Sequence, residues 1–250
     1  MAATAPTVTS TALGSGAKTY ASASPSVCSI GSSTGAVSFV AAGTCRLNVN
    51  IAADSSYAFA TSAQISFSLV YQVGDTGPGG GVIFLTPYAG VNSTGSYFEA
   101  APAGWSGAAT DQIAQWCNRT TSYLGTTGVA PRLLTIGSGQ ANTNAMVAAD
   151  KCTSGAGNVA RAYTGGSRTD WFLPSIEELQ AMYAQNVAIG GFVEMTESPS
   201  RRFTTYWSSS EDSSNSFHAR SWSFATNRND NWDKSLKYGV RPIRSFEPIG

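Results

Sequence analysis

The residues of this chain whose types could support hydrolysis lie in its last fifty positions. His218 is the single histidine, and Ser208 and Asp212 precede it closely enough for a Ser-His-Asp arrangement to be drawn on paper. A nucleophile elbow carries a G-x-S-x-G sequence around its serine, and no such sequence surrounds Ser208. We therefore predict no catalytic residue here.

A second polar group offers oxygen atoms to a cation. Asp230, Asn231 and Asp233 could reach a calcium ion, but the EF-hand spacing with its distal glutamate is absent. The alternative interpretation is a solvated acidic loop. A zinc site is disfavoured because the chain has one histidine and no C-x-x-C. We predict neither a metal nor another cofactor.

The four cysteines are better explained by disulfides. Cys28 and Cys45 fall in one candidate domain, and Cys117 and Cys152 fall in the other. We predict the pairs Cys28–Cys45 and Cys117–Cys152, which imply an oxidising, extracellular setting. The alternative is four buried thiols.

Composition excludes two classes of partner. The formal net charge is zero and charged residues make up 12% of the chain, so the basic footprint of a nucleic-acid or anionic-membrane binder is missing. No run approaches the ~20 apolar residues that span a bilayer. The first residues lack the features of a signal peptide. We expect either that an export signal precedes this sequence or that the protein reaches the outside as part of a larger particle.

The N-terminal part is predicted to be a small β-sandwich. Short β-prone runs, "PTVTSTAL", "SVCSI", "AVSFVAAGTCRLNVNIA" and "AQISFSLVY", are separated by Ser, Gly and Pro. Within them Leu47, Val49 and Ile51 alternate with polar residues, the pattern of a half-buried strand. The glycines and proline of 77–81 break the pattern, so we place a domain boundary near residues 71–77. A phosphate loop at Gly79–Gly81 is disfavoured because no Gly-Lys-Ser/Thr follows.

Two helices are predicted in the C-terminal part. One covers "SGQANTNAMVAADKC" and ends at Cys152. The other covers "LPSIEELQAMYAQ", where Ser175 and Glu178 have the spacing of a capping box. Glu177 and Glu178 suit the helix dipole and are poor candidates for a catalytic pair. Strands follow, and in "SWSFA" we expect Trp222 and Phe224 to pack while Ser221 and Ser223 remain available on the opposite face.

The last predicted strands and loops also contain the residue types that are typical of a binding surface. Aromatic residues and Arg or Lys alternate with short Asn, Ser and Asp side chains between residues 206 and 238. Rigid rings supply contact area in such surfaces, while small polar groups adapt to the partner. The alternative is that these aromatic residues form the core of an ordinary β-domain and the polar residues lie in solvent-exposed loops.

Two resemblances extend this interpretation. Residues 5 to 69 resemble the bacterial Ig-like repeats of surface proteins. Residues 72 to 247, with "GDTGPGGGVIF", "YFEAAPAGW", "WCN", "YWSSSE" and "YGVRPIRSF", resemble the C-terminal domain of bacterial collagen-like surface proteins. The second resemblance implies a C-type-lectin-like fold of the subgroup shared with formylglycine-generating enzymes. The expected fold is thus an all-β Ig-like domain over 1–71 and an α+β lectin-like domain with two helices over 72–250.

Within that subgroup the chain looks most similar to the variable proteins of diversity-generating retroelements, in which mutated adenines diversify a binding surface. The resemblance implies fixed residues at Trp207, Ser208, Ser209, Phe224, Lys234, Val240, Arg241, Pro242 and Arg244. It places the ligand-binding surface on His218, Arg220, Ser221, Ser223, Thr226, Arg228, Asp230, Asn231, Asp233, Ser235 and Tyr238, to which we add Trp232 and Lys237.

The genetic code provides a check, because mutated asparagine codons can encode only certain residue types. Randomising the first two bases of an asparagine codon that ends in a pyrimidine gives residues such as Ser, Thr, Asp, Tyr and Arg, but never Trp or Lys. Ser221, Thr226, Arg228 and Tyr238 pass this test, whereas Trp232 and Lys237 must be fixed or arise otherwise.

The expected function is ligand recognition without bond chemistry. The ligand would be a protein or glycan on another cell or particle, met at a cell surface or phage surface. One alternative is an ordinary surface adhesin without diversification. Another is an enzyme related to formylglycine-generating enzymes, which the absence of any cysteine after Cys152 opposes. A third is a structural cap on a surface fibre.

Overall fold

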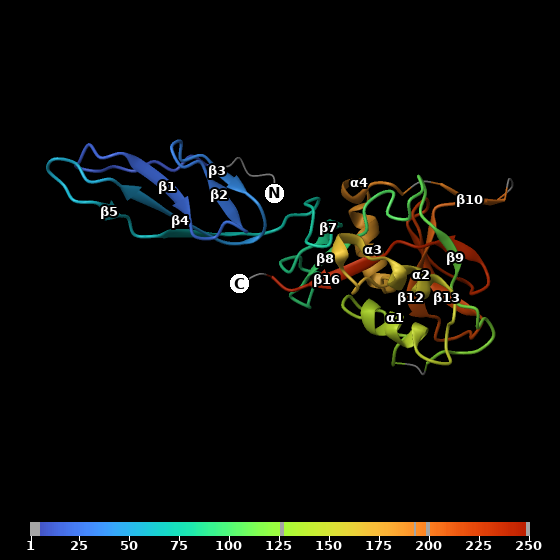
Figure 1. Cartoon of the computed structure of the whole chain (residues 1–250). Helices are drawn as coiled ribbons and strands as arrows, with labels where there is room; N and C mark the ends of the chain where they lie inside the picture. The colour runs from blue at the N-terminus through green and yellow to red at the C-terminus, as the bar shows by residue number, and fades with distance from the viewer. Residues whose placement is uncertain (1–5, 126–127, 193, 199–200, 249–250) are drawn as a thin grey trace. The chain divides into compact units, whose positions relative to one another are not determined.

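The computed structural model describes residues 6–125, 128–192, 194–198 and 201–248, and side chains are described outside 195–198 and 201–203. The ends of the two predicted domains, residues 1–5 and 249–250, lie outside this part. The chain separates into two compact units, one over the first 72 residues with Pro248 and one over residues 73–247 (Figure 1). The protein is rich in β-structure.

The strands of the N-terminal unit pair antiparallel. They are β1 (Lys18–Ser22), β2 (Cys28–Ile30), β3 (Val37–Phe39), β4 (Gly43–Ile51), β5 (Ala60–Thr61) and β6 (Ile65–Leu69). β4 is central to one sheet, pairing with β1, β5 and β6, and β2 pairs with β3 in a second. The predicted run at 6–13 contributes only an isolated bridge between Thr7 and Ala36.

The long strand β4 shows the predicted alternation. Leu47 and Val49 are buried, and Ile51 is half-buried at the strand end. On the same face Cys45 forms the predicted disulfide with Cys28 of β2. This bond therefore ties the two sheets of the unit together, with Leu47 packed beside it.

The C-terminal unit mixes strands with short helices. Its strands are β7 (Val82–Leu85), β8 (Tyr97–Ala100), β9 (Ile113–Gln115), β10 (Met195–Ser198), β11 (Arg201–Phe203), β12 (Thr205–Glu211), β13 (His218–Ser223), β14 (Arg228–Asp233), β15 (Lys237–Gly239) and β16 (Ile243–Phe246). Its helices are α1 (Gly139–Val147), α2 (Ala156–Ala162), the 3-10 turn η1 (Gly165–Ser167), α3 (Ile176–Ala184) and α4 (Asn186–Ile189).

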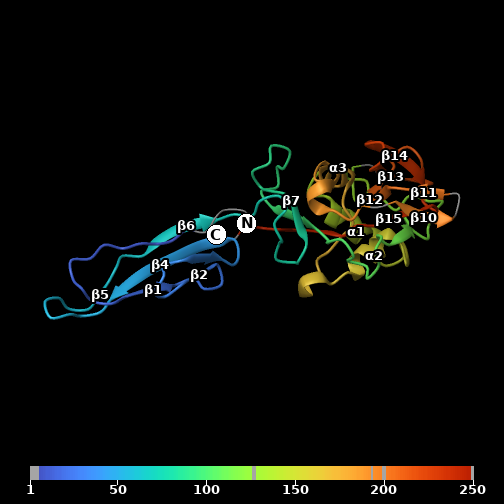
Figure 2. The same cartoon turned by 90° about the horizontal axis from the view of Figure 1, so that it is seen from above.

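A five-stranded sheet in the order β14-β13-β12-β15-β9 organises this unit, and Figure 2 labels its first four strands. Successive residues of a strand point to opposite faces. Tyr206 accordingly joins the hydrophobic cluster that contains Leu179 of α3, and Trp207 joins the one that contains Met146 of α1. Helix α3 thus covers one face of the sheet, and α1 with α2 covers the other. The three-stranded sheet β16-β8-β7 adds Phe98 to the α3 cluster.

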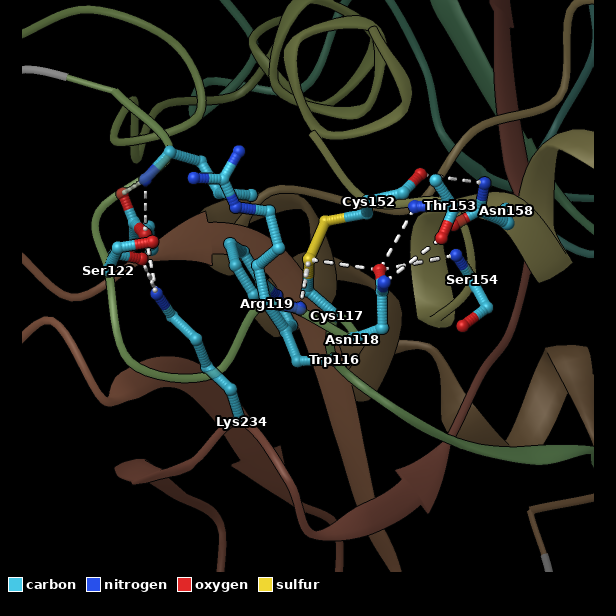
Figure 3. Close-up of a disulfide and its surroundings, with 12 residues drawn as sticks. Trp116, Cys117, Asn118, Arg119, Ser122, Cys152, Thr153, Ser154, Asn158 and Lys234 are labelled. Carbon is cyan, nitrogen blue, oxygen red and sulfur yellow. Dashed lines mark hydrogen bonds and ion pairs between the residues drawn. A yellow bond between two sulfur atoms is a disulfide. The ribbon is translucent and has the colours of Figure 1, made fainter. Parts of the chain in front are cut away.

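The second predicted disulfide, Cys117–Cys152, links the chain after β9 to the segment between α1 and α2 (Figure 3). Both cysteines are buried. Asn118 fixes the same junction, because its side chain donates to the Thr153 hydroxyl and accepts from the Thr153 N–H. Two disulfides are typical of an oxidising, extracellular environment. In the part of the chain described, no helix is long and apolar enough to cross a membrane.

The prediction of two helices is wrong, because the described residues form four α-helices. The stretch that becomes α2 contains small side chains, and only contacts with the core, made by Ala156 and Ala160, reveal its buried face. Helix α1 forms as predicted but ends at Val147. The chain leaves the helical conformation at Ala148 and turns, which brings Cys152 to Cys117.

The glycine-rich segment before β7 binds a carboxylate of the protein itself. The N–H groups of Gly79 and Gly81 donate to the two carboxylate oxygens of buried Glu99, each over 2.9 Å. Arg244 completes the site with a 2.6 Å contact to Glu99 Oε1. A Cβ atom at Gly81 would lie 2.5 Å from the Ala100 carbonyl oxygen. These glycines therefore serve the fold, because their N–H groups are already occupied.

The predicted capping box at α3 is confirmed. Ser175 Oγ accepts from the Glu178 N–H, and Glu178 accepts from the Ser175 N–H over 2.7 Å. Glu178 also accepts from the N–H groups of Gly137 and Gly139, which docks the start of α1 against α3. Burial raises the pKa of the Glu178 carboxyl from 4.5 to about 7, although these N–H groups act in the opposite direction.

Glu178 should make stability depend on pH. Between pH 4.5 and about 7 the folded state holds a proton that the unfolded chain releases. The stability from this group is therefore complete below pH 4.5 and is lost as the pH rises through 7. Between pH 8 and pH 5 we expect the wild type to gain about 2 kcal/mol relative to E178Q, which cannot titrate. Urea unfolding at both pH values measures the difference.

The exposed neighbour Glu177 supplies the control. E177Q retains the buried carboxyl and should follow the wild-type pH dependence. An equal stability difference between wild type and E178Q at both pH values would contradict the assignment.

Candidate binding surface

The predicted binding residues lie mainly on one β-hairpin. β13 and β14 pair antiparallel in continuous register, from His218 opposite Asp233 to Ser223 opposite Arg228. A four-residue turn joins them, in which Asn227 adopts a positive φ of 53°. β14 is the edge strand of the five-stranded sheet. A hairpin at a sheet edge exposes far more of its side chains than a central strand does.

We use the term hairpin surface for the predicted residues that solvent reaches. The exposed members are Thr226, Arg228, Asn231, Trp232, Ser235 and Lys237, and the half-buried members are His218, Arg220, Asp230 and Asp233.

Three predicted surface residues are buried. Ser221 and Ser223 belong to β13, which has neighbours on both sides and clusters against both faces, so the expected free face is covered. Ser221 Oγ donates to the Asp230 carbonyl oxygen instead. Tyr238 is 5% exposed and packs on Trp207, with ring centroids 4.9 Å apart. None of these three side chains is displayed for a ligand.

The pleat divides β14 between two faces. Arg228, Asp230 and Trp232 alternate with Asn229, Asn231 and Asp233 along the strand. Arg228 and Asp230 form a solvent-exposed ion pair with a separation of 3.8 Å, which holds the two side chains together but contributes little stability. The two aspartates therefore point to opposite sides of the strand, an arrangement that does not suit a shared cation.

Trp232 connects this surface to the core. Its side chain is 43% exposed, and its ring meets Tyr238 edge-on with centroids 6.3 Å apart. Since Tyr238 packs on Trp207, the three rings extend from a fully buried position to solvent. The packed neighbour restricts the ring of Trp232 and leaves part of it free for contact.

The turn after β14 is held by its own carboxylate. Asp233 Oδ1 accepts from the Ser235 N–H over 2.8 Å. This hydrogen bond, with the nearby His218 and Lys234, lowers the pKa of Asp233 below its ordinary value. His218 faces Asp233 across the hairpin. Asp233 is therefore an ionised, preorganised acceptor at neutral pH.

The buried side chain of Lys234 holds the same turn to the protein interior. Its side chain is fully buried, and Nζ donates to Glu211 Oε1 over 2.6 Å. It also donates to the carbonyl oxygens of Ser122 and Ser216, as Figure 3 shows for Ser122. Glu211 in turn accepts from Arg132 over 3.2 Å. One ammonium group thus joins β12, the end of β14 and two loops.

The residues expected to be fixed share this buried character. Arg241 contacts Asp111 through Nε and Nη2, and Arg244 contacts Glu99 and Asp170. Every member of the set is buried except Phe224, which is half-buried in the α3 cluster. These members are Trp207, Ser208, Ser209, Lys234, Val240, Arg241, Pro242 and Arg244.

The hydrolytic arrangement drawn from the sequence does not assemble. Ser208 Oγ donates to the Arg220 carbonyl oxygen, and Asp212 accepts from Ser214. The side chain of His218 contacts Asn215 at 3.3 Å. Among the described residues, no group of three or more His, Cys, Asp or Glu lies close enough to hold a metal ion.

Sequence reasoning missed two exposed residues beside the hairpin surface. Asn229 shares a face of β14 with Asn231, and the strand alternation alone could have identified it. Phe217, which is 47% exposed, immediately precedes β13. Phe217 is one of the aromatic residues between 206 and 238 that suggest an interaction surface, but it is not among the predicted ligand-binding residues.

A comparison of the chain with protein-family models found no matching family, and a comparison with curated proteins found no matching relative.

Two neighbouring lysines test the anchoring role. Lys234→Ala removes a buried charge that Glu211 needs, and we expect it to cost about 3 kcal/mol of unfolding free energy. Lys237→Ala alters an exposed side chain and should change stability by less than about 0.5 kcal/mol. Urea unfolding of both variants measures this, and equal losses would show that the buried pair has no special role.

Proposed function

We propose that the protein is a displayed ligand-binding protein whose hairpin surface recognises a partner on another cell or particle. The C-terminal unit would be a C-type-lectin-like domain of the subgroup shared with formylglycine-generating enzymes, and the N-terminal unit an Ig-like spacer. In this proposal the hairpin surface is diversified by a retroelement, as the resemblance implies.

One observation carries the proposal. Of the eleven residues expected to vary, four are exposed and four are half-buried on one hairpin and the turns beside it, whereas the residues expected to be fixed are buried apart from half-buried Phe224. Side chains such as Arg228 and Asn231 can change with little effect on packing, since surface substitutions usually alter stability only slightly. Lys234, which lies between variable positions in the sequence, must stay because Glu211 pairs with it.

The chemistry of the surface favours binding over catalysis. Trp232 and Arg228, which leave the same face of β14, are of the types that contribute most energy at protein interfaces. Short polar residues on the same hairpin can adapt to different partners. The outward display of the surface fits a protein of an oxidising, extracellular setting, at a cell surface or on a phage particle.

Binding can be tested with a variant that spares the core. Replacing Arg228, Asn231, Trp232 and Lys237 together by Ala should lower capture of a ligand selected from an array of cell-surface proteins and glycans by at least tenfold. Biolayer interferometry measures the affinity, and circular dichroism checks folding. The matched control replaces Glu177 and Gln180, exposed residues of α3, and should bind normally. A folded hairpin variant that binds as tightly as the wild type refutes the assignment.

Diversification makes a separate prediction about DNA. In genes from several isolates, adenine-specific differences should fall in codons of exposed residues such as Thr226, Arg228 and Asn231. The codon of buried Lys234 should be unchanged, and a near-copy of the segment should lie nearby. Differences spread evenly over the gene would leave an ordinary surface adhesin.

A further inference from the structure

The strand β6 leaves one edge of the N-terminal unit open. Among the described strands it pairs with β4 alone. Ser66 and Ser68 of β6 are exposed, and neither makes a backbone hydrogen bond with a described residue outside the β4 pairing. The outer side of this strand is therefore bare backbone.

The hydrogen bonds of β4 show which groups of β6 face outward. Alternate residues of a strand in an antiparallel sheet direct their N–H and C=O groups to opposite sides. The Arg46 carbonyl oxygen accepts from the residue directly after β1, so its neighbour Cys45 is directed to the other side, towards β6. Cys45 stands opposite Phe67, which bonds back to β4. The N–H and C=O groups of Ser66 and Ser68 consequently point to the open edge.

Other edges of the protein are covered or charged, as natural sheet edges usually are. The outer side of β1 is covered where the Tyr20 N–H donates to the Ser32 carbonyl oxygen over 2.8 Å. The edge of β3 is covered where the Val37 N–H donates to the Pro6 carbonyl oxygen over 3.0 Å. The edge strand β14 carries charged side chains. In contrast, the β6 sequence "ISFSL" contains no charge and no proline that would oppose an added strand.

The sequence of β6 matches itself when it is read in the opposite direction. Phe67 and Leu69 pack towards the core of the unit, and Ile65 lines an apolar cavity of about 160 Å³ on the same face. If two β6 strands pair antiparallel about Phe67, Ile65 stands opposite Leu69 of the second copy. Ser66 then stands opposite Ser68 of the second copy on the other face. Apolar side chains meet apolar ones and hydroxyl groups meet hydroxyl groups, so a single register suits both faces.

We infer that β6 is the site at which a second copy of this chain binds, by antiparallel pairing of the two β6 strands about a two-fold axis. The open N–H and C=O groups of Ser66 would bond to those of Ser68 of the second copy, and the symmetry repeats these bonds. Ile65, which is 49% exposed, would be covered in the same step. An unrelated strand would satisfy the backbone but would lack the matched side chains, which favours a copy of the same chain.

The inference goes beyond the proposed function and does not depend on it. Strand addition from one five-residue strand makes a small interface, so we expect a dissociation constant on the order of 100 µM. Pairing would be favoured where many copies are concentrated. It would also join two C-terminal units in one assembly, and two linked binding surfaces hold a multivalent ligand more tightly than one does.

Sedimentation velocity of the full chain tests the pairing without any ligand. Between about 10 µM and about 1 mM, the average mass of the wild type should rise from monomer towards dimer. S66K/S68K sets lysines opposite each other across the axis and should weaken dimerisation at least tenfold. Both serines are exposed, so the variant should fold, which circular dichroism checks. The matched control S29K/S55K adds the same charge at exposed serines outside β6 and should dimerise within about twofold of the wild type.

Cysteine crosslinking tests the register. Directly opposite residues of an antiparallel pair lie close enough for a disulfide, whereas two copies of residue 66 would be offset along the strands. An equimolar mixture of S66C and S68C should therefore form a crosslinked dimer under mild oxidation at least fivefold faster than either variant alone. Non-reducing gel electrophoresis measures the rates.

Three results would overturn the inference. The first is a wild type that stays monomeric over the whole concentration range. The second is equal dimerisation of the two lysine variants, which would assign any self-association to another surface or to net charge. The third is equal crosslinking of the mixture and the separate cysteine variants, which would exclude the register about Phe67.

Discussion

The buried ion pair between Lys234 and Glu211 holds the end of the hairpin in place. Desolvating two charges is expensive, and the cost is recovered here because every hydrogen of the ammonium group has an acceptor. The pair fixes the end of β14 to β12 and to two loops at once. The residues on either side of Lys234 in the sequence are then free to face solvent without loosening the strand.

Buried ion pairs also hold the C-terminal residues 241–244 in place. Arg241 ties β15 and β16 to Asp111, and Arg244 ties β16 to Glu99 and through it to the glycine-rich loop before β7. These bonds join residues more than a hundred positions apart. Charged residues make up only 12% of the chain, and several of them are buried inside the C-terminal unit.

The sequence predicted the features that depend on local pattern. Alternation identified β4, and the Ser175 and Glu178 spacing identified the start of α3. The position of each cysteine pair within one candidate domain identified both disulfides. It failed where burial depends on distant segments. Ser221 and Ser223 have a polar period-2 pattern, yet they are covered because β13 lies inside the sheet, and α2 has too few large apolar residues to be recognised before its partners are known.

Trp232 is the residue that the codon argument could not place, and its contacts now explain it. If the surface is diversified as proposed, a residue that randomised asparagine codons cannot produce would be a fixed position. Trp232 packs edge-on against Tyr238, which packs on Trp207 within the sheet. It is the outermost of three rings that begin in the core, so its contact with Tyr238 restricts its position while part of the ring remains exposed. A constant aromatic anchor supplies contact area at low entropic cost. In the proposed surface, it provides affinity that variable neighbours such as Asn231 direct towards one ligand or another.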